Sequence, residues 1–271
     1  MEKRHMHMMA IFCKSCKKDI YICDRMLKSF ILHNRDGIKM FVSVPESEIK
    51  YFLEFSRFDN VEVLSDQSYA DKYMSQNQYH GLSVGYVNQE ICKLSFWETK
   101  FALNYLCVDS DVIFLRDFFI TDFLANQDIP YTVLVQDKEL SIEKEYRDFW
   151  IYREKFIRTI YREIDLVDKR YRTCHGMQVL NAKVLNSLKE DFMLCKNYTY
   201  EKLISIAPYE FTWYNAWFQK CGLVEEKQVE PFFYTFHYKN QLEFYKQKLL
   251  TEDDIAKAYI GVVYNSNMYV F

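Results

Sequence analysis

Two carboxylates, Asp109 and Asp111, interrupt an otherwise apolar stretch at residues 104–117. In a strand both side chains point to the same face, with Ser110 on the other. Burying two like charges together is costly unless a cation compensates them. We therefore expect a strand that ends where the pair binds Mg²⁺ or Mn²⁺, hard cations that prefer oxygen ligands. The alternative is an exposed strand end whose acids are solvated or cap the next element.

A divalent ion held by two carboxylates suits a substrate that carries a diphosphate, because the ion takes up charge as the diphosphate leaves. In an α/β sheet such ligands lie at the carboxyl ends of the strands. The D-x-D spacing carries little information alone, since chance produces it often. The apolar flanks of Asp109 and Asp111 are the informative part. Nucleotidyl or phosphoryl transfer and glycosyl transfer are the chemistries that this pair favours.

The elements around the pair alternate between strand-like and helix-like patterns, which predicts a parallel α/β sheet. Strands are expected at residues 8–13, 39–44, 61–64 and 105–115, and helices at 20–33, 46–55 and 88–99. In the second half we expect strands at residues 131–136 and 178–184, helices at 141–165 and 213–221, and an apolar tail at 256–271. No linker or repeat divides the chain, so we expect one domain.

The predicted helix at residues 141–165 has an apolar stripe for the core, formed by Ile142, Tyr146, Phe149, Trp150, Phe156, Ile157, Ile160 and Ile164. Its other face carries Lys, Arg and Glu, which indicates a solvated surface, with a partner or a membrane surface as the alternative.

Composition excludes several classes of protein. The formal net charge of −3 gives no basic field for nucleic acid, and six Gly in 271 residues make a Gly-rich phosphate loop improbable. No apolar segment approaches the roughly 18 residues of a membrane span, and the N-terminus does not read as an export signal. We therefore expect a cytoplasmic protein with eight reduced cysteines. The single C-x-x-C of Cys13 and Cys16 lacks the second pair that a zinc site needs.

The order of several short motifs resembles that of nucleotide-sugar-dependent glycosyltransferases of the GT-A fold, and in particular a group of bacterial and viral glycosyltransferase-like proteins. The matching positions are Lys14, Ser15 and Asp19; Gln89, Lys93 and Leu94; Asp109, Ser110 and Asp111; His175 and Met177; and Tyr209, Glu210 and Phe211. The resemblance spans roughly residues 8–240. It implies a single GT-A (Rossmann-like) α/β domain over residues 1–271, with a mixed, mostly parallel sheet flanked by helices. Residues of about 1–130 would bind the nucleotide sugar, and those of about 131–271 the acceptor.

The resemblance also implies roles for individual residues. Donor contacts would come from Lys14, Ser15, Asp19, Asp66, Gln89, Lys93, Asp109, Ser110 and Lys239. Gln89 and Lys93 are four residues apart, so they share one helix face. Mn²⁺ or Mg²⁺ would be held by Asp109, Asp111 and His237. Each of three residues also has a purely structural alternative. Asp66 could form a turn or a helix cap, Lys93 could be a solvated surface charge, and His237 could be a packed, hydrogen-bonded side chain.

Glu210 is the residue we expect to act as the base that deprotonates the acceptor, because an apolar setting would raise the pKa of its carboxyl. The alternative is a glutamate at a helix N-terminus. His175 is a second candidate for the base or for contact with the acceptor. A retaining enzyme needs no such base, and the sequence leaves the stereochemical outcome open.

Together with the paired carboxylates, the resemblance implies a metal-dependent glycosyltransferase, of the hexosyltransferase type, that moves a sugar from a nucleotide donor to a glycan or glycolipid acceptor in surface polysaccharide synthesis. A UDP-sugar is the expected donor. Without a transmembrane segment, the chain would meet a membrane only peripherally. The alternatives are a nucleotidyltransferase with a two-carboxylate metal site and a non-catalytic carbohydrate-binding protein.

Overall fold

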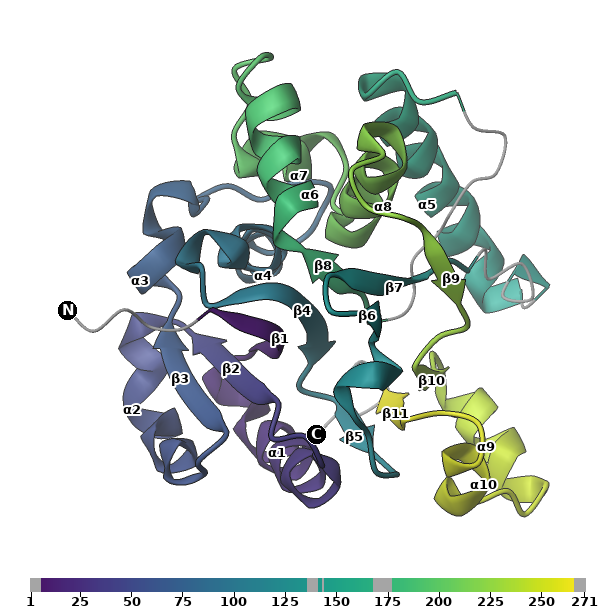
Figure 1. Ribbon diagram of the computed structural model, residues 1–271. Helices are drawn as coiled ribbons and strands as arrows, with labels where there is room; N and C mark the ends of the chain where they lie inside the picture. The colour runs from purple at the N-terminus through teal and green to yellow at the C-terminus, as the bar shows by residue number, and fades with distance from the viewer. Residues whose placement is uncertain (1–5, 136–140, 143, 168–176, 266–271) are drawn as a thin grey trace.

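The computed structural model describes residues 6–135, 141–142, 144–167 and 177–265. A five-stranded sheet forms its centre, in the order β3-β2-β1-β4-β8 (Figure 1). The strands are β1 (His7–Lys14), β2 (Lys39–Val44), β3 (Val61–Ser65), β4 (Ala102–Asp109) and β8 (Val179–Asn181). The first four are parallel, and β8 is antiparallel to β4. The predicted mixed, mostly parallel sheet is therefore confirmed.

Helices cover both faces of this sheet. Helices α1 (Ile20–His33) and α2 (Ile49–Phe52) pack on one face, and α3 (Gln67–Ala70) and α4 (Val84–Ser95) pack on the other. Strand residues alternate between the two cores, so Phe12 of β1 and Cys107 of β4 face α4, whereas Ile11 and Val108 face α1. Two residues beyond Phe12 and Cys107, Lys14 and Asp109 continue on the side of α4.

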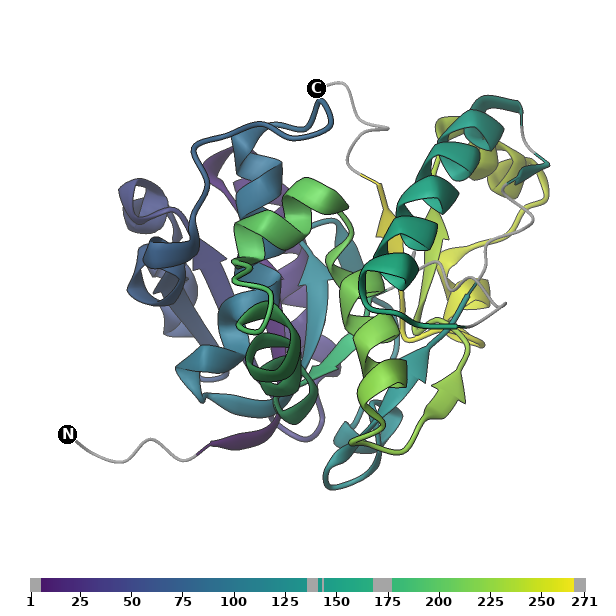
Figure 2. The same cartoon turned by 90° about the horizontal axis from the view of Figure 1, so that it is seen from above.

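The remaining segments of the chain form a helical layer and two small sheets (Figures 1 and 2). The helices are α5 (Lys144–Glu163), α6 (Ala182–Ser187), α7 (Tyr200–Ile206) and α8 (Glu210–Cys221), with a π-helical segment at Leu188–Met193. One small sheet contains β6 (Leu124–Asn126), β7 (Ile129–Val133) and β9 (Lys227–Val229). The other contains β5 (Val112–Phe114), β11 (Gly261–Tyr264) and β10 (Phe233–Phe236), and the helices α9 (Lys239–Gln247) and α10 (Glu252–Ala256) connect β10 to β11.

The single strand predicted at residues 105–115 is wrong. Strand β4 ends at Asp109, Ser110 and Asp111 form a turn, and β5 then pairs with β11 in a different sheet. Asp109 and Asp111 therefore do not share one face of one strand. Gly261 permits the close pairing of β11 with β5, because a Cβ at this position would collide with the carbonyl oxygen of Ile113.

Other predicted boundaries shift for local reasons. Residues 178–184 were expected as one strand, but the side chain of Asn181 caps α6 by accepting hydrogen bonds from the backbone N–H of Lys183 and Val184. Residues 46–55 form α2 between two 3₁₀ turns rather than one helix. Ile142, predicted to lie in a core stripe, is 73% exposed and precedes α5. None of the described helices combines the length and the apolarity needed to cross a bilayer.

Candidate functional site

The carboxyl ends of β1 and β4 lie side by side at the point where the strand order reverses. From β1 the chain moves outward through β2 to β3, and β4 then returns to the other side of β1. Lys14 pairs in register with Asp109 at this position. Just beyond it, the Ser110 hydroxyl donates a 2.8 Å hydrogen bond to the Ser15 hydroxyl. In open parallel sheets, such a switch point is where ligands bind.

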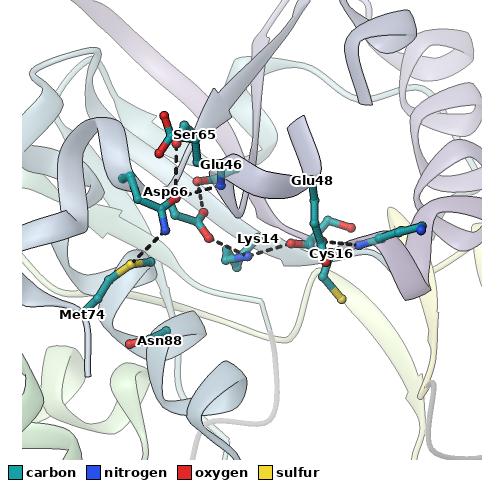
Figure 3. A network of polar contacts seen from close by, with 12 residues as sticks. Lys14, Cys16, Glu46, Glu48, Ser65, Asp66, Met74 and Asn88 are labelled. Carbon is teal, nitrogen blue, oxygen red and sulfur yellow. Dashed lines mark hydrogen bonds and ion pairs between the residues drawn. The ribbon is translucent and has the colours of Figure 1, made fainter. Parts of the chain in front are cut away.

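Lys14 and Asp66 form a buried ion pair next to this switch point (Figure 3). Lys14 Nζ lies 3.0 Å from Asp66 Oδ2, and the Ser43 hydroxyl donates to Asp66 Oδ1 at 2.6 Å. Burial raises the pKa of Asp66, against the opposing effect of Lys14. Lys14 and Asp66, both predicted to contact the donor, therefore lie close together and form an ion pair with each other. Asp19, by contrast, lies at the start of α1, where it accepts a hydrogen bond from the Cys16 thiol.

Helix α4 holds the side chain of Asp109. The Gln89 amide donates to Asp109 Oδ1 at 3.0 Å, and Lys93 Nζ lies 3.1 Å from the same oxygen. Ser83 caps the N-terminus of this helix, which begins at Val84, four residues before the predicted start. Gln89 and Lys93 share one helix face, as their spacing predicted, and both contact Asp109; their contact with a donor stays a prediction.

Lys93 is also paired with Glu210 at the start of α8. Its Nζ lies 2.8 Å from Glu210 Oε1 and 4.9 Å from the centre of the Phe211 ring, and its side chain is only 3% exposed. Burial alone would lower the pKa of Lys93, but Asp109 and Glu210 raise it well above its usual value. Lys93 is therefore a buried ammonium ion rather than a solvated surface charge.

Glu90 lies in the same buried charge cluster as Lys93, Asp109 and Glu210, and it was not predicted from the sequence. It is 2% exposed and accepts a 3.1 Å hydrogen bond from the backbone N–H of Glu210. Burial and the neighbouring Glu210 carboxylate raise the pKa of Glu90 well above its usual value, which favours the protonated form. The available signal was a charged residue within the apolar stripe of α4, between Val87 and Ile91.

The expected rise in the pKa of Glu210 is wrong. Burial acts in that direction, but the Lys93 ammonium outweighs it and lowers the pKa. Glu210 is thus a buried carboxylate engaged in an ion pair, at the first residue of α8. The second candidate base, His175, lies outside the described residues.

The described residues contain no group of three or more His, Cys, Asp or Glu side chains arranged to hold a metal. His237 does not join Asp109 and Asp111 in such a group. It lies beside the rings of Tyr146 and Tyr238, where burial and the nearby Arg153 lower its pKa to about 4. Lys239 is 78% exposed at the start of α9, 3.9 Å from Glu243.

Arg153 is a second buried charge that the sequence did not reveal. It is 2% exposed on the inner face of α5, with its guanidinium 5.5 Å from the centre of the Tyr209 ring. The apolar stripe predicted for this helix passes directly from Trp150 to Phe156 and skips position 153. A basic residue at that gap was the signal for a buried cation near α8.

Comparison with known proteins connects this arrangement to a family and a fold. A family described as a family of unknown function (DUF6492) matches residues 8–150, which include β1, β4 and α4. The chain belongs to this family. No curated protein matches the chain in sequence.

Two glycosyltransferase structures share the fold. The apo structure of mouse xyloside xylosyltransferase 1 is 8% identical, with a TM-score of 0.52 over 97% of this chain and 99% of that chain. The apo structure of the WbbM bifunctional glycosyltransferase is 12% identical, with a TM-score of 0.52 over 97% of this chain and 47% of that chain. The family member described here therefore has the GT-A-like fold of these glycosyltransferases, as a single α/β domain with a mostly parallel sheet.

Proposed function

We propose that this protein is a glycosyltransferase that binds a nucleotide sugar at the carboxyl ends of β1 and β4. The observation that carries the proposal is the position of Asp109 and Ser110 beside Lys14 and Ser15, at the switch point of a sheet with a glycosyltransferase fold. The donor expected first is a UDP-sugar, and the acceptor a glycan or glycolipid of a surface polysaccharide.

Lys93 and Gln89 fix the orientation of Asp109 in this proposal. Both contact Oδ1, whereas Oδ2 makes no hydrogen bond or ion pair with any described residue, on a side chain that is 34% exposed. Asp109 can therefore present one carboxylate oxygen to a ligand without losing its partners. Asp111 follows two residues later, in the turn after β4.

The donor set at this turn fits Mn²⁺ or Mg²⁺, because both ions prefer carboxylate oxygens. We propose that Asp109 and Asp111 would hold the ion. The bound ion would neutralise the charge that develops on the leaving diphosphate.

Glu210 acts as a positioning residue rather than as the base in this scheme. Its carboxylate is 7% exposed and holds Lys93, which in turn holds Asp109. The cluster thereby joins α8, in the predicted acceptor half, to the end of β4. A base role for His175 stays a prediction, as does the choice between inversion and retention.

A thermal-shift screen of nucleotides and nucleotide sugars, with and without Mn²⁺, tests this proposal. A ligand present at 100 times its Kd should stabilise the protein by about 2.7 kcal/mol. Asp109→Asn should abolish the Mn²⁺-dependent part of the shift. Asp117→Asn is the matched control, because Asp117 lies eight residues after Asp109 and forms an exposed ion pair with Arg35.

Each alternative gives a different result. Stabilisation by a nucleoside triphosphate and turnover with a sugar phosphate would indicate a nucleotidyltransferase. Stabilisation by free glycans, with no nucleotide response, would indicate a carbohydrate-binding protein. A flat response to all uridine, guanosine, cytidine and thymidine compounds would refute the proposed donor site.

A further inference from the structure

The outer face of α5 is unusually basic. The helix lies at the edge of the molecule next to α8 (Figure 2) and buries Tyr146, Arg153, Phe156 and Ile157 on its inner side. Of its described side chains, the exposed ones are Lys144, Arg147, Asp148, Ile151, Tyr152, Lys155, Arg158 and Arg162. Five of these are cations and one is an acid.

The cations form a stripe. Lys144, Ile151, Lys155 and Arg162 follow one another at spacings of seven, four and seven residues, which places them on one line along an α-helix. At a rise of about 1.5 Å per residue, this line is roughly 27 Å long. The stripe therefore presents an extended linear surface rather than a point site.

Within the part of the chain that the structure describes, most cations of this stripe lack the acidic partners that usually balance the charge of a solvated helix face. Arg158 pairs with Glu154 at 2.6 Å, but Lys144 and Lys155 form no ion pair with a described acid. Among the described residues, the guanidinium of Arg162 bonds only within the helix, to the Thr159 hydroxyl and to the carbonyl of Arg158. A cationic stripe on a chain of net charge −3 is a local field that attracts an anionic surface.

Apolar side chains interrupt the stripe at its middle. Ile151 is 54% exposed and Tyr152 is 45% exposed, and Ile142 just before the helix is 73% exposed. Lys and Arg interleaved with such residues are typical of helices that lie at a lipid interface. A soluble polyanion would contact the cations only, whereas a lipid surface would also bury the exposed isoleucines.

We propose that the outer face of α5 binds the surface of an anionic lipid bilayer. Because the inner face packs on the protein, the helix docks along the surface, with Ile151 and Tyr152 reaching the headgroup region. On the inner face, Arg153 contacts Tyr209, the residue before Glu210. Membrane docking of this kind does not depend on sugar transfer, and it would hold the half proposed to bind the acceptor beside the bilayer.

Co-sedimentation of the full chain with vesicles tests this surface. We expect binding to phosphatidylcholine vesicles that contain phosphatidylglycerol, little binding to pure phosphatidylcholine, and weakening with salt. The triple variant Lys144→Gln, Lys155→Gln and Arg162→Gln should bind about 100-fold more weakly, because each cation near an anionic surface contributes about fivefold. Glutamine keeps the helix propensity, so circular dichroism should stay unchanged.

The matched control removes the same charge elsewhere. Lys50→Gln, Lys202→Gln and Lys246→Gln change exposed residues of α2, α7 and α9 and should leave vesicle binding intact. An equal loss in both triple variants would overturn the assignment to α5.

A third variant separates a bilayer from a soluble polyanion. Ile151→Ser should weaken binding to vesicles severalfold while leaving binding to dextran sulfate unchanged. A wild-type protein that binds dextran sulfate but no vesicle would contradict membrane docking, as would equal binding to neutral and anionic vesicles.

Discussion

Replacing Lys93 by Met probes the buried charge cluster most directly. Lys93 Nζ lies 2.8 Å from Glu210 and 3.1 Å from Asp109, and Met removes the ammonium while keeping an apolar chain. Glu210, 7% exposed, would then be a buried carboxylate without its cation. Removing one partner of a buried ion pair costs about 3–5 kcal/mol, a large part of the 5–15 kcal/mol typical of a domain. Urea unfolding followed by circular dichroism at pH 7 should show this loss.

The loss should shrink as the pH falls. In the wild type, the lowered pKa of Glu210 contributes stability that is present above the unfolded pKa of about 4.3. That stability is lost only as the pH falls through the lower, folded pKa. In Lys93→Met the ammonium is gone and burial is the largest remaining influence, so the pKa of Glu210 should rise, and protonation should then remove the uncompensated charge. Unfolding curves from pH 7 to pH 5 measure the difference.

Two comparisons make the result decisive. The double variant Lys93→Met, Glu210→Gln should recover part of the lost stability, because the buried carboxylate is gone. Lys183→Met breaks an exposed pair with Asp128 and should cost less than about 1 kcal/mol. A Lys93→Met variant as stable as Lys183→Met, with no dependence on pH, would refute the buried cluster.

Other charged groups give shorter tests. Lys14→Met should lower the free energy of unfolding by about 3 kcal/mol because Asp66 is left buried without its cation, whereas urea unfolding of Lys28→Met, at an exposed pair, should match the wild type. His237 should titrate in NMR spectra with a pKa of about 4. Because the unfolded imidazole takes up a proton near pH 6.5 and the folded one does not, the free energy of unfolding should fall as the pH drops below about 6.5. An unshifted titration would contradict the burial of His237. A carboxyl whose pKa is raised by folding destabilises the folded state once the pH exceeds its unfolded pKa. In urea unfolding, the free energy of unfolding of Glu90→Gln should therefore increase relative to that of the wild type as the pH rises. Parallel pH profiles of the two proteins would show that Glu90 is not held protonated.

The alternation of strands and helices in the first half could be predicted because hydrophobic periodicity is a local signal. Strands β1, β2 and β3 lie within one residue of their predicted bounds. The prediction failed at residues 105–115, where apolar residues continue on both sides of the turn at Ser110 and Asp111. Which sheet a short strand joins depends on a distant partner, and β5 pairs with β11 near the other end of the chain.

One feature of the site followed from spacing, namely a helix face shared by two side chains. The separation of four residues placed Gln89 and Lys93 on one helix face, the resemblance assigned them to the donor site, and both contact Asp109. The environment of Glu210 could not be read in this way, because Lys93 and Glu90 lie 117 and 120 positions away in the sequence. Local apolar neighbours predicted a raised pKa, and a distant ammonium reverses it.

The fold also explains why Asp109 and Asp111 can lie so close together in an apolar stretch of the sequence. Strand β4 ends between them, so they occupy different environments. Asp109 is held by α4 and has Lys93 as its counterion, while the backbone carbonyl of Asp111 accepts a hydrogen bond from Tyr264 of β11. The cation that the sequence required for Asp109 is therefore supplied by the protein itself. A divalent ion is not needed to balance the charge of Asp109, and the case for it rests on Asp109 Oδ2 and on the glycosyltransferase fold. The Mn²⁺ arm of the nucleotide screen thus tests the metal separately from the donor: stabilisation by a nucleotide sugar without Mn²⁺ would leave Lys93 as the cation that serves the site.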